Sequence, residues 1–132
     1  MTTVHLVEYK EANDAVRAVF DDIRETRGSD FINNFWKALA NNPEQLQRTW
    51  EQLKVVMAPG TLDPLTKELI YIAVSAANSC EYCVHSHTAA ARAKGLSDEQ
   101  YGELLAVVGM AHHTNGLVTT MQVEVDDAFK AG

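Results

Sequence analysis

Four residues in the middle of the chain have side chains and a spacing suited to thiol chemistry. Glu68 is followed twelve residues later by Cys80, and then by Cys83 and His87. On a helix, Cys83 and His87 are four residues apart and therefore neighbours on one face, with Cβ atoms about 5–6 Å apart. An imidazole beside a thiol takes its proton or stabilises the thiolate, which is the reactive form of cysteine. The pattern predicts a dithiol with its own general base.

Cys80 and Glu68, which both precede Cys83 in the chain, extend this group. Cys80 lies one turn nearer the helix start, where free N–H groups and the positive end of the helix dipole should lower the pKa of both thiols. Three residues is also a spacing across which a CxxC pair closes a disulfide. Taken alone, Glu68 would more often be a solvated residue of a first helical turn. If the chain folds back at Asn78 and Ser79, however, Glu68 approaches His87 directly or through a water and orients the imidazole.

Zinc is the main competing use of Cys80, Cys83 and His87. Tetrahedral zinc holds its ligand atoms at most about 4.5 Å apart. On one straight helix, Cys80 and His87 are separated by about 10.5 Å along the axis. Redox chemistry is therefore favoured over a metal site, and neither a metal nor a cofactor is expected.

The elements that must position these residues are helices, because apolar residues recur at 3.6-residue spacing and nearly all prolines and glycines fall between the periodic segments. Helices are predicted over residues 8–26, 31–39, 43–57, 64–77, 78–95, 97–111 and 117–129. The first ends at Gly28, and the second is capped by Ser29 or Asp30 and carries Phe31, Phe35 and Trp36. Asn42 and Asp63 precede the third and fourth, and Ser97 begins a capping box for the sixth. The segment 112–116 predicts a kink or short connection. His85 is expected at the surface, and the adjacent His112 and His113 in packing or capping roles. The fold class is all-α, with about six to seven helices in one domain over residues 1–132.

Composition and charge exclude several classes of protein. The chain has 132 residues, of which 46% are hydrophobic and 22% charged, so it is not a disordered tail. Its net charge of −7 argues against a nucleic-acid partner. No apolar run approaches the roughly 18–20 residues of a membrane span, and the first residues show no secretory signal. A cytoplasmic protein is expected.

The segment KELIYIAVSAANSCEYCVHSHTAAARAKGLSDEQ, residues 67–100, resembles the core of the AhpD-like alkylhydroperoxidase and carboxymuconolactone decarboxylase superfamily. The resemblance rests on Glu68, Cys80, Cys83 and His87 and on the Gly-Leu-Ser turn that follows, and it covers roughly residues 60–110. It implies an all-helical fold that assembles into trimers or hexamers. The nearly all-apolar segment 69–77 fits this, because such a helix is usually buried on every side, within a bundle or at a subunit contact.

The resemblance also implies an antioxidant thiol peroxidase or disulfide reductase that acts on hydroperoxides. The cysteine matched by Cys83 attacks the peroxide, the one matched by Cys80 resolves the sulfenic acid as a disulfide, and the residues matched by Glu68 and His87 form a proton relay. A dithiol reductant, in the best-known members a lipoyl-type carrier, then restores the thiols. These members carry a second histidine where this chain has Tyr82, and a phenol with a pKa of about 10 is no base at neutral pH.

Three other functions stay open for the same residues. The first is a thiol–disulfide oxidoreductase or redox sensor without peroxide turnover. The second is a decarboxylase like carboxymuconolactone decarboxylase, against which the CxxC pair argues because that branch generally lacks it. The third is a non-enzymatic metal-binding or scaffold subunit that uses Cys80, Cys83 and His87.

Overall fold

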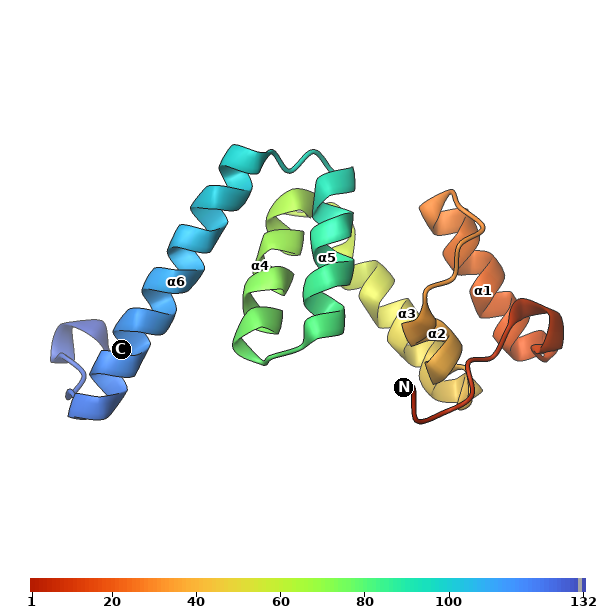
Figure 1. Cartoon of the computed structure of the whole chain (residues 1–132), viewed down its shortest axis with the longest axis horizontal. Coiled ribbons are helices and arrows are strands. Elements are labelled where there is room, and N and C mark those ends of the chain that lie inside the picture. The colour runs from red at the N-terminus through yellow and green to blue at the C-terminus, as the bar shows by residue number, and fades with distance from the viewer. Residues whose placement is uncertain (131) are drawn as a thin grey trace. The chain divides into compact units, whose positions relative to one another are not determined.

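The chain is all-helical. The computed structural model describes residues 1–130 and 132, and within them it contains six α-helices, two short 3₁₀ helices and no strand (Figure 1). In chain order these are η1 (Tyr9–Glu11), α1 (Asp14–Arg27), α2 (Asn34–Leu39), α3 (Pro43–Met57), α4 (Pro64–Ala77), α5 (Glu81–Ala93), α6 (Asp98–Met121) and η2 (Asp127–Phe129). The all-α prediction is confirmed. The helices form two compact units, Met1–Ala58 and Pro59–Gly132, and the single domain over residues 1–132 stays a prediction.

In the first unit, α1, α2 and α3 surround one apolar core. Trp36 of α2 and Trp50 of α3 meet edge to face, with ring centroids 5.4 Å apart, and both are buried. Phe31 and Phe35, predicted on the same helix as Trp36, are exposed, although the ring of Phe35 contacts that of Trp36 with centroids 4.8 Å apart. The most buried side chains around the two tryptophans are Val16, Phe20, Ile23 and Leu46.

Three helices begin where their caps predict. Asn42, Asp63 and Ser97 are N-cap residues of α3, α4 and α6, and each side chain accepts a hydrogen bond from the backbone N–H three residues on. Pro43 and Pro64 take the first helical position, where the missing N–H costs nothing. These bonds join residues close in sequence, so the sequence pattern is sufficient to locate them.

The helix predicted over residues 8–26 is split. Residues 9–11 form η1, and α1 begins only at Asp14, because Asn13 is extended and its side chain accepts from the N–H of Val16. The helix ends as predicted at Gly28, whose φ of 64° is a left-handed conformation that glycine adopts without strain.

The predicted start of α2 is also wrong. The helix begins at Asn34 behind Asn33, three residues after the expected start behind Ser29 or Asp30. The Ser29 hydroxyl accepts a hydrogen bond from the N–H of Phe31, two residues on. This bond forms a local turn and does not cap a helix.

The largest departure from prediction is α6. It runs without interruption through 112–116, where a kink or connection was expected, and ends at Gln122, whose φ is 51°. A glycine inside a helix, such as Gly116, costs only about 1 kcal/mol relative to alanine. Ending the helix there would cost more, since a second helix would have to be nucleated anew. The separate helix over 117–129 is therefore wrong.

The second unit is built on the helical hairpin of α4 and α5 (Figure 1). Asn78 ends α4, Ser79 adopts a left-handed φ of 56°, and the N–H of Cys80 donates to the carbonyl of Ser75 at 2.9 Å. This turn reverses the chain so that α5 runs back along α4. The small core of the unit consists of Ile72, Ala91 and Leu96, with Leu65, Leu69, Tyr101 and Leu104 packed against it.

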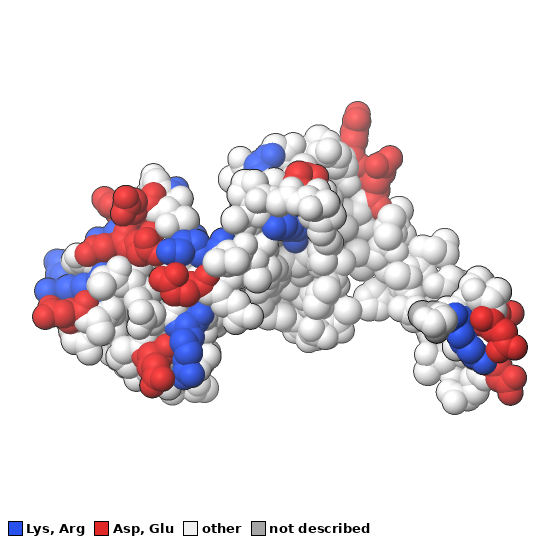
Figure 2. Space-filling model, turned by 180° about the vertical axis from the view of Figure 1, so that it is seen from behind, with Lys and Arg blue, Asp and Glu red and all other residues white. Residues whose placement is uncertain are grey.

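Much of the apolar surface of this unit is uncovered. Ile70 and Val74 of α4 are 48% and 53% exposed, so the chain's own helices do not bury the 69–77 segment on every side, and its burial at a subunit contact stays a prediction. Helix α6 has no buried residue, and the sequence has no Lys, Arg, Asp or Glu between Glu103 and Glu124. Figure 2 shows this part of α6 as a long stretch without charged side chains. Among the described residues, no helix has both the length and the hydropathy needed to cross a membrane.

Candidate functional site

Glu68 and His87 form a direct hydrogen bond, although they are nineteen residues apart. The distance between His87 Nδ1 and Glu68 Oε2 is 2.7 Å. A carboxylate only accepts, so Nδ1 carries the proton and donates it to Glu68, which leaves Nε2 as the basic nitrogen of the neutral ring. Glu68 is buried, with 4% of its surface exposed. Glu68 is therefore not a solvated residue of a first helical turn. The reversal of the chain at Asn78 and Ser79 brings its carboxylate to the imidazole of His87.

Lys94 is a second partner of Glu68 that the sequence reading missed. Its Nζ lies 3.0 Å from Glu68 Oε1, so the two oxygens of one carboxylate are held by two different side chains of α5 and its end. Lys94 follows His87 by seven residues, or two helical turns, and this spacing was the signal that could have found it.

The carboxyl group of Glu68 is held ionised. Burial raises its pKa, but the hydrogen bonds from His87 and Lys94, together with the positive charge of Lys94, outweigh burial and lower the pKa of Glu68 from its ordinary value of 4.5. An ionised carboxylate at this place fixes the orientation and the tautomer of His87.

Tyr71 is the second residue that sequence reasoning missed. Its ring is stacked on the imidazole of His87, with centroids 3.6 Å apart and planes at 19°. Burial raises the pKa of Tyr71, and its electrostatic interactions with Cys83, Cys80 and Glu68 raise it further, so the phenol is neutral at physiological pH. Tyr71 lies three residues after Glu68 on α4, a spacing that puts both on one helix face.

Both cysteines are free thiols and half-buried. Cys80 was predicted to lie inside a helix over residues 78–95, but it is the N-cap residue of α5. Its sulfur accepts a hydrogen bond from the N–H of Cys83 at 3.3 Å. The start of a helix is a place where a backbone N–H and the helix dipole stabilise an anionic sulfur.

The electrostatics of Cys83 differ from the prediction. The hydrogen bond to the Cys80 sulfur, burial and the charge of Cys80 raise the pKa of Cys83 to about 11. The expectation that the helix start lowers the pKa of both thiols is therefore wrong for Cys83. The physical reason is that Cys83 lies one turn inside the helix, next to a second sulfur that competes for the same proton.

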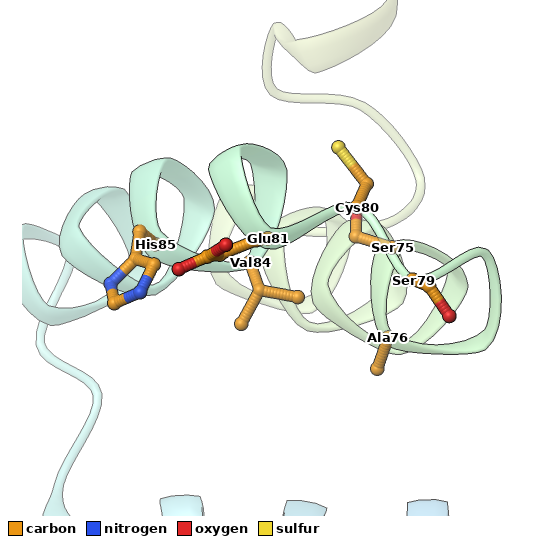
Figure 3. A pocket seen from close by; sticks show the side chains of 7 residues that line it. All are labelled: Ser75, Ala76, Ser79, Cys80, Glu81, Val84 and His85. Carbon is orange, nitrogen blue, oxygen red and sulfur yellow. The ribbon is translucent and has the colours of Figure 1, made fainter. Parts of the chain in front are cut away.

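Of the remaining predicted residues, His85 is exposed, as expected. His85 lines a shallow depression of about 240 Å³ beside Cys80, together with Ser75, Ala76, Ser79, Glu81 and Val84. In Figure 3 the sulfur of Cys80 points away from Ala76 and Val84. His112 and His113 are exposed in the middle of α6, so their predicted packing or capping roles are wrong. Within the part of the chain that the structure describes, no three His, Cys, Asp or Glu side chains are arranged to hold a metal ion.

Comparison with known proteins fits this arrangement of residues. The sequence profile of the carboxymuconolactone decarboxylase family matches residues 43–123. The chain belongs to this family. The matched range contains Glu68, Cys80, Cys83 and His87, as well as Tyr71 and Lys94.

Relatives within the family include proteins named for hydroperoxide reduction. The chain is 35% identical over 98 residues to alkyl hydroperoxide reductase AhpD of Solibacter usitatus, covering 72% of this chain and 54% of the relative, so it spans about half of that protein's length. It is 37% identical over 81 residues to uncharacterized protein 4 in the cox locus of Paracoccus denitrificans, covering 57% of this chain and 72% of that one.

A solved structure resembles the whole chain. The crystal structure of the alkylhydroperoxidase AhpD core from Rhodospirillum rubrum is 60% identical, with a TM-score of 0.97, and the match covers 100% of this chain and 99% of that one. The AhpD-like fold expected from the sequence is confirmed.

Proposed function

We propose that this AhpD-like protein is a thiol peroxidase that reduces hydroperoxides through the dithiol of Cys80 and Cys83. The observation that carries the proposal is the 2.7 Å hydrogen bond between Glu68 and His87, one helical turn from Cys83. It leaves a basic nitrogen on an oriented ring beside a thiol that does not ionise by itself. The raised pKa of Cys83, about 11, keeps this thiol protonated at pH 7 unless a base takes its proton.

In the first step His87 Nε2 takes the proton of Cys83, and the thiolate attacks one oxygen of the hydroperoxide. The sulfur–oxygen bond forms as the oxygen–oxygen bond breaks, and the leaving alkoxide receives the proton from the imidazolium. Cys83 becomes a sulfenic acid, and the peroxide is reduced by two electrons to an alcohol. Glu68 supports this cycle because its negative charge stabilises the imidazolium in between.

In the second step the sulfur of Cys80 attacks the sulfenic acid of Cys83, the disulfide forms, and water leaves. The two residues are separated by one turn, and the Cys80 sulfur already accepts from the N–H of Cys83. A dithiol reductant of the lipoyl type then returns two electrons and two protons. A cytoplasmic location belongs to the same proposal, because a reducing compartment keeps such a pair in its dithiol form.

The N-cap position of Cys80 favours a second candidate function. In CxxC pairs of thiol–disulfide oxidoreductases the cysteine at the helix start is the nucleophile. Cys80 has that position, and the raised pKa of Cys83 fits a resolving thiol. In this case Cys80 attacks a disulfide substrate, and no hydroperoxide is consumed.

Single-cysteine variants separate the two functions. If the peroxidase proposal is right, Cys80→Ser consumes one equivalent of hydroperoxide and stalls with a sulfenic acid on Cys83 that a dimedone-type probe traps. Cys83→Ser then consumes little peroxide and yields almost no trapped product. Mass spectrometry after limiting peroxide locates the label. If the label appears on Cys80 in Cys83→Ser and not on Cys83 in Cys80→Ser, the roles of the two cysteines are reversed. If hydroperoxide causes no loss of thiols in the wild type, the peroxidase proposal is wrong and the thiol–disulfide oxidoreductase is the function that stands.

The proposal includes assembly of several copies, as trimers or hexamers. It is supported by α6, which has no buried residue and no charged side chain between residues 104 and 121, and by the exposed Ile70 and Val74 of α4. Large uncovered apolar surfaces usually mark contacts with another molecule. Light scattering is expected to give a multiple of the 14.6 kDa chain mass, and a stable monomer at micromolar concentration would contradict this.

A further inference from the structure

The carboxylate of Glu68 has two nitrogen partners, of which the proposed chemistry uses only His87. We propose that Lys94 is a positioning residue of the relay, whose positive charge shares the negative charge of Glu68 with His87 and so sets the pH at which His87 accepts the proton of the dithiol. This inference rests on the proposed function, since it takes His87 as the base.

The geometry supports a shared charge rather than two independent contacts. Lys94 Nζ lies 3.0 Å from Glu68 Oε1, and His87 Nδ1 lies 2.7 Å from Glu68 Oε2. Glu68 is buried, whereas 39% of the Lys94 side chain is exposed. Lys94 follows α5 as its C-cap residue. The two donor residues are therefore about 10.5 Å apart along the helix axis, and their side chains converge on one carboxylate.

The charged and titratable groups around His87 come from both helices of the hairpin. Glu68 and Tyr71 face it from α4, while Cys80, Cys83 and Lys94 belong to α5 and its two ends. Asp98 of α6 pairs with Arg92 at 3.1 Å and is exposed, so it belongs to a separate ion pair. Lys94 is thus a cation in direct contact with the Glu68–His87 pair.

The direction of the effect follows from the charges. With Lys94 in place, the negative charge on Glu68 is partly compensated, and the imidazolium of His87 gains less from it. Without Lys94, the whole charge of Glu68 acts on His87, so the imidazole stays protonated, and unable to act as a base, up to a higher pH. We take an effective dielectric constant of about 20 and reduce the resulting interaction because water screens the partly exposed Lys94. The pH at which His87 loses its proton then shifts by roughly 0.5–1 pH unit.

The test compares Lys94→Gln with Lys94→Arg. The glutamine variant keeps a hydrogen bond to Glu68 without the charge, whereas the arginine variant keeps the charge. As a control, Arg92→Gln removes a cation of the same helix end that does not touch Glu68. The first readout is the NMR titration of the His87 ring in the reduced protein. The second is the pH profile of the alkylation rate of the dithiol.

Lys94→Gln is expected to raise both midpoints by roughly 0.5–1 pH unit, Lys94→Arg to recover most of that shift, and Arg92→Gln to leave both midpoints in place. An unchanged or lowered His87 midpoint in Lys94→Gln would overturn the inference, as would an NMR shift without a matching shift in alkylation. Neither readout uses a peroxide. A failure of the proposed peroxidase function would therefore appear separately, as a wild-type dithiol that hydroperoxide does not oxidise.

Discussion

Replacement of Glu68 by glutamine tests whether this buried carboxylate orients the base. Glutamine has nearly the same shape but only one accepting oxygen, and its amide nitrogen donates. Of the two bonds that Glu68 accepts from His87 and Lys94, Glu68→Gln can keep one. The other donor is left facing an N–H₂ group. The variant also imitates the protonated form of Glu68, which the wild type does not adopt at neutral pH.

The magnitude follows from the lost bond. A hydrogen bond to a charged group contributes about 1.5–3 kcal/mol. Because Lys94 is partly exposed and water replaces some of its contact, we expect a loss of about 1–2 kcal/mol in the free energy of unfolding at pH 7. The rate of dithiol oxidation by hydroperoxide should fall on the order of 10²-fold, since an imidazole without its oriented tautomer is a poor base.

The pH dependence of this loss has a definite sign. The pKa of Glu68 is lowered in the folded protein, so the ionised side chain stabilises the fold at pH values above its ordinary pKa of 4.5. This contribution decreases as the pH falls through the lowered pKa of the folded state. The difference in stability between the wild type and Glu68→Gln should therefore be full at pH 7 and shrink below pH 4.5.

Urea unfolding at pH 7 and at several values below 4.5 measures this difference. The matched control is Glu103→Gln, which removes a carboxylate from an exposed position on α6 and should change neither stability nor rate. Equal stability of Glu68→Gln and wild type at pH 7 would refute the reasoning. So would a difference that does not change with pH, because it would arise from packing rather than from charge.

Two further predictions concern the ring of His87. His87→Ala should slow alkylation of Cys83 at pH 7 and leave the helical content unchanged. His85→Ala, on the exposed face of α5, should behave as the wild type. Equal alkylation rates for both variants across pH 6–9 would remove His87 from the mechanism. Tyr71→Leu should lose the stacking on His87, with about 1–2 kcal/mol of stability and a slower reaction, while Tyr71→Phe should retain both. A Tyr71→Phe variant as slow as Tyr71→Leu would show that the hydroxyl group, and not the stacked ring, is what the reaction needs.

Sequence patterns mispredicted helix boundaries where two patterns favoured different local structures. Residues 112–116 contain types that favour turns, yet α6 continues through them, because the hydrogen bonds of a formed helix outweigh the small preferences of single residues. At Asn13 the competition had the opposite outcome. The apolar spacing continued across it, but its side chain caps α1, so the helix begins later than the spacing predicts.

The sequence by itself determined the all-α fold, the starts of α3, α4 and α6, and the placing of Cys83 and His87 one turn apart on α5, because these depend on contacts within one turn of the chain. The family resemblance named the same four residues. The sequence offered His87 as a partner of Glu68 only on condition that the chain folds back, and it did not offer Lys94, so the tertiary structure decided both contacts. The turn at residues 78–80 sets the register of α4 against α5, and this register places Glu68 between His87 and Lys94 and places Tyr71 on the imidazole. Such contacts join residues 16 to 26 positions apart, and no local hydrogen-bond pattern or helical period specifies them. Only the packing of the two helices does.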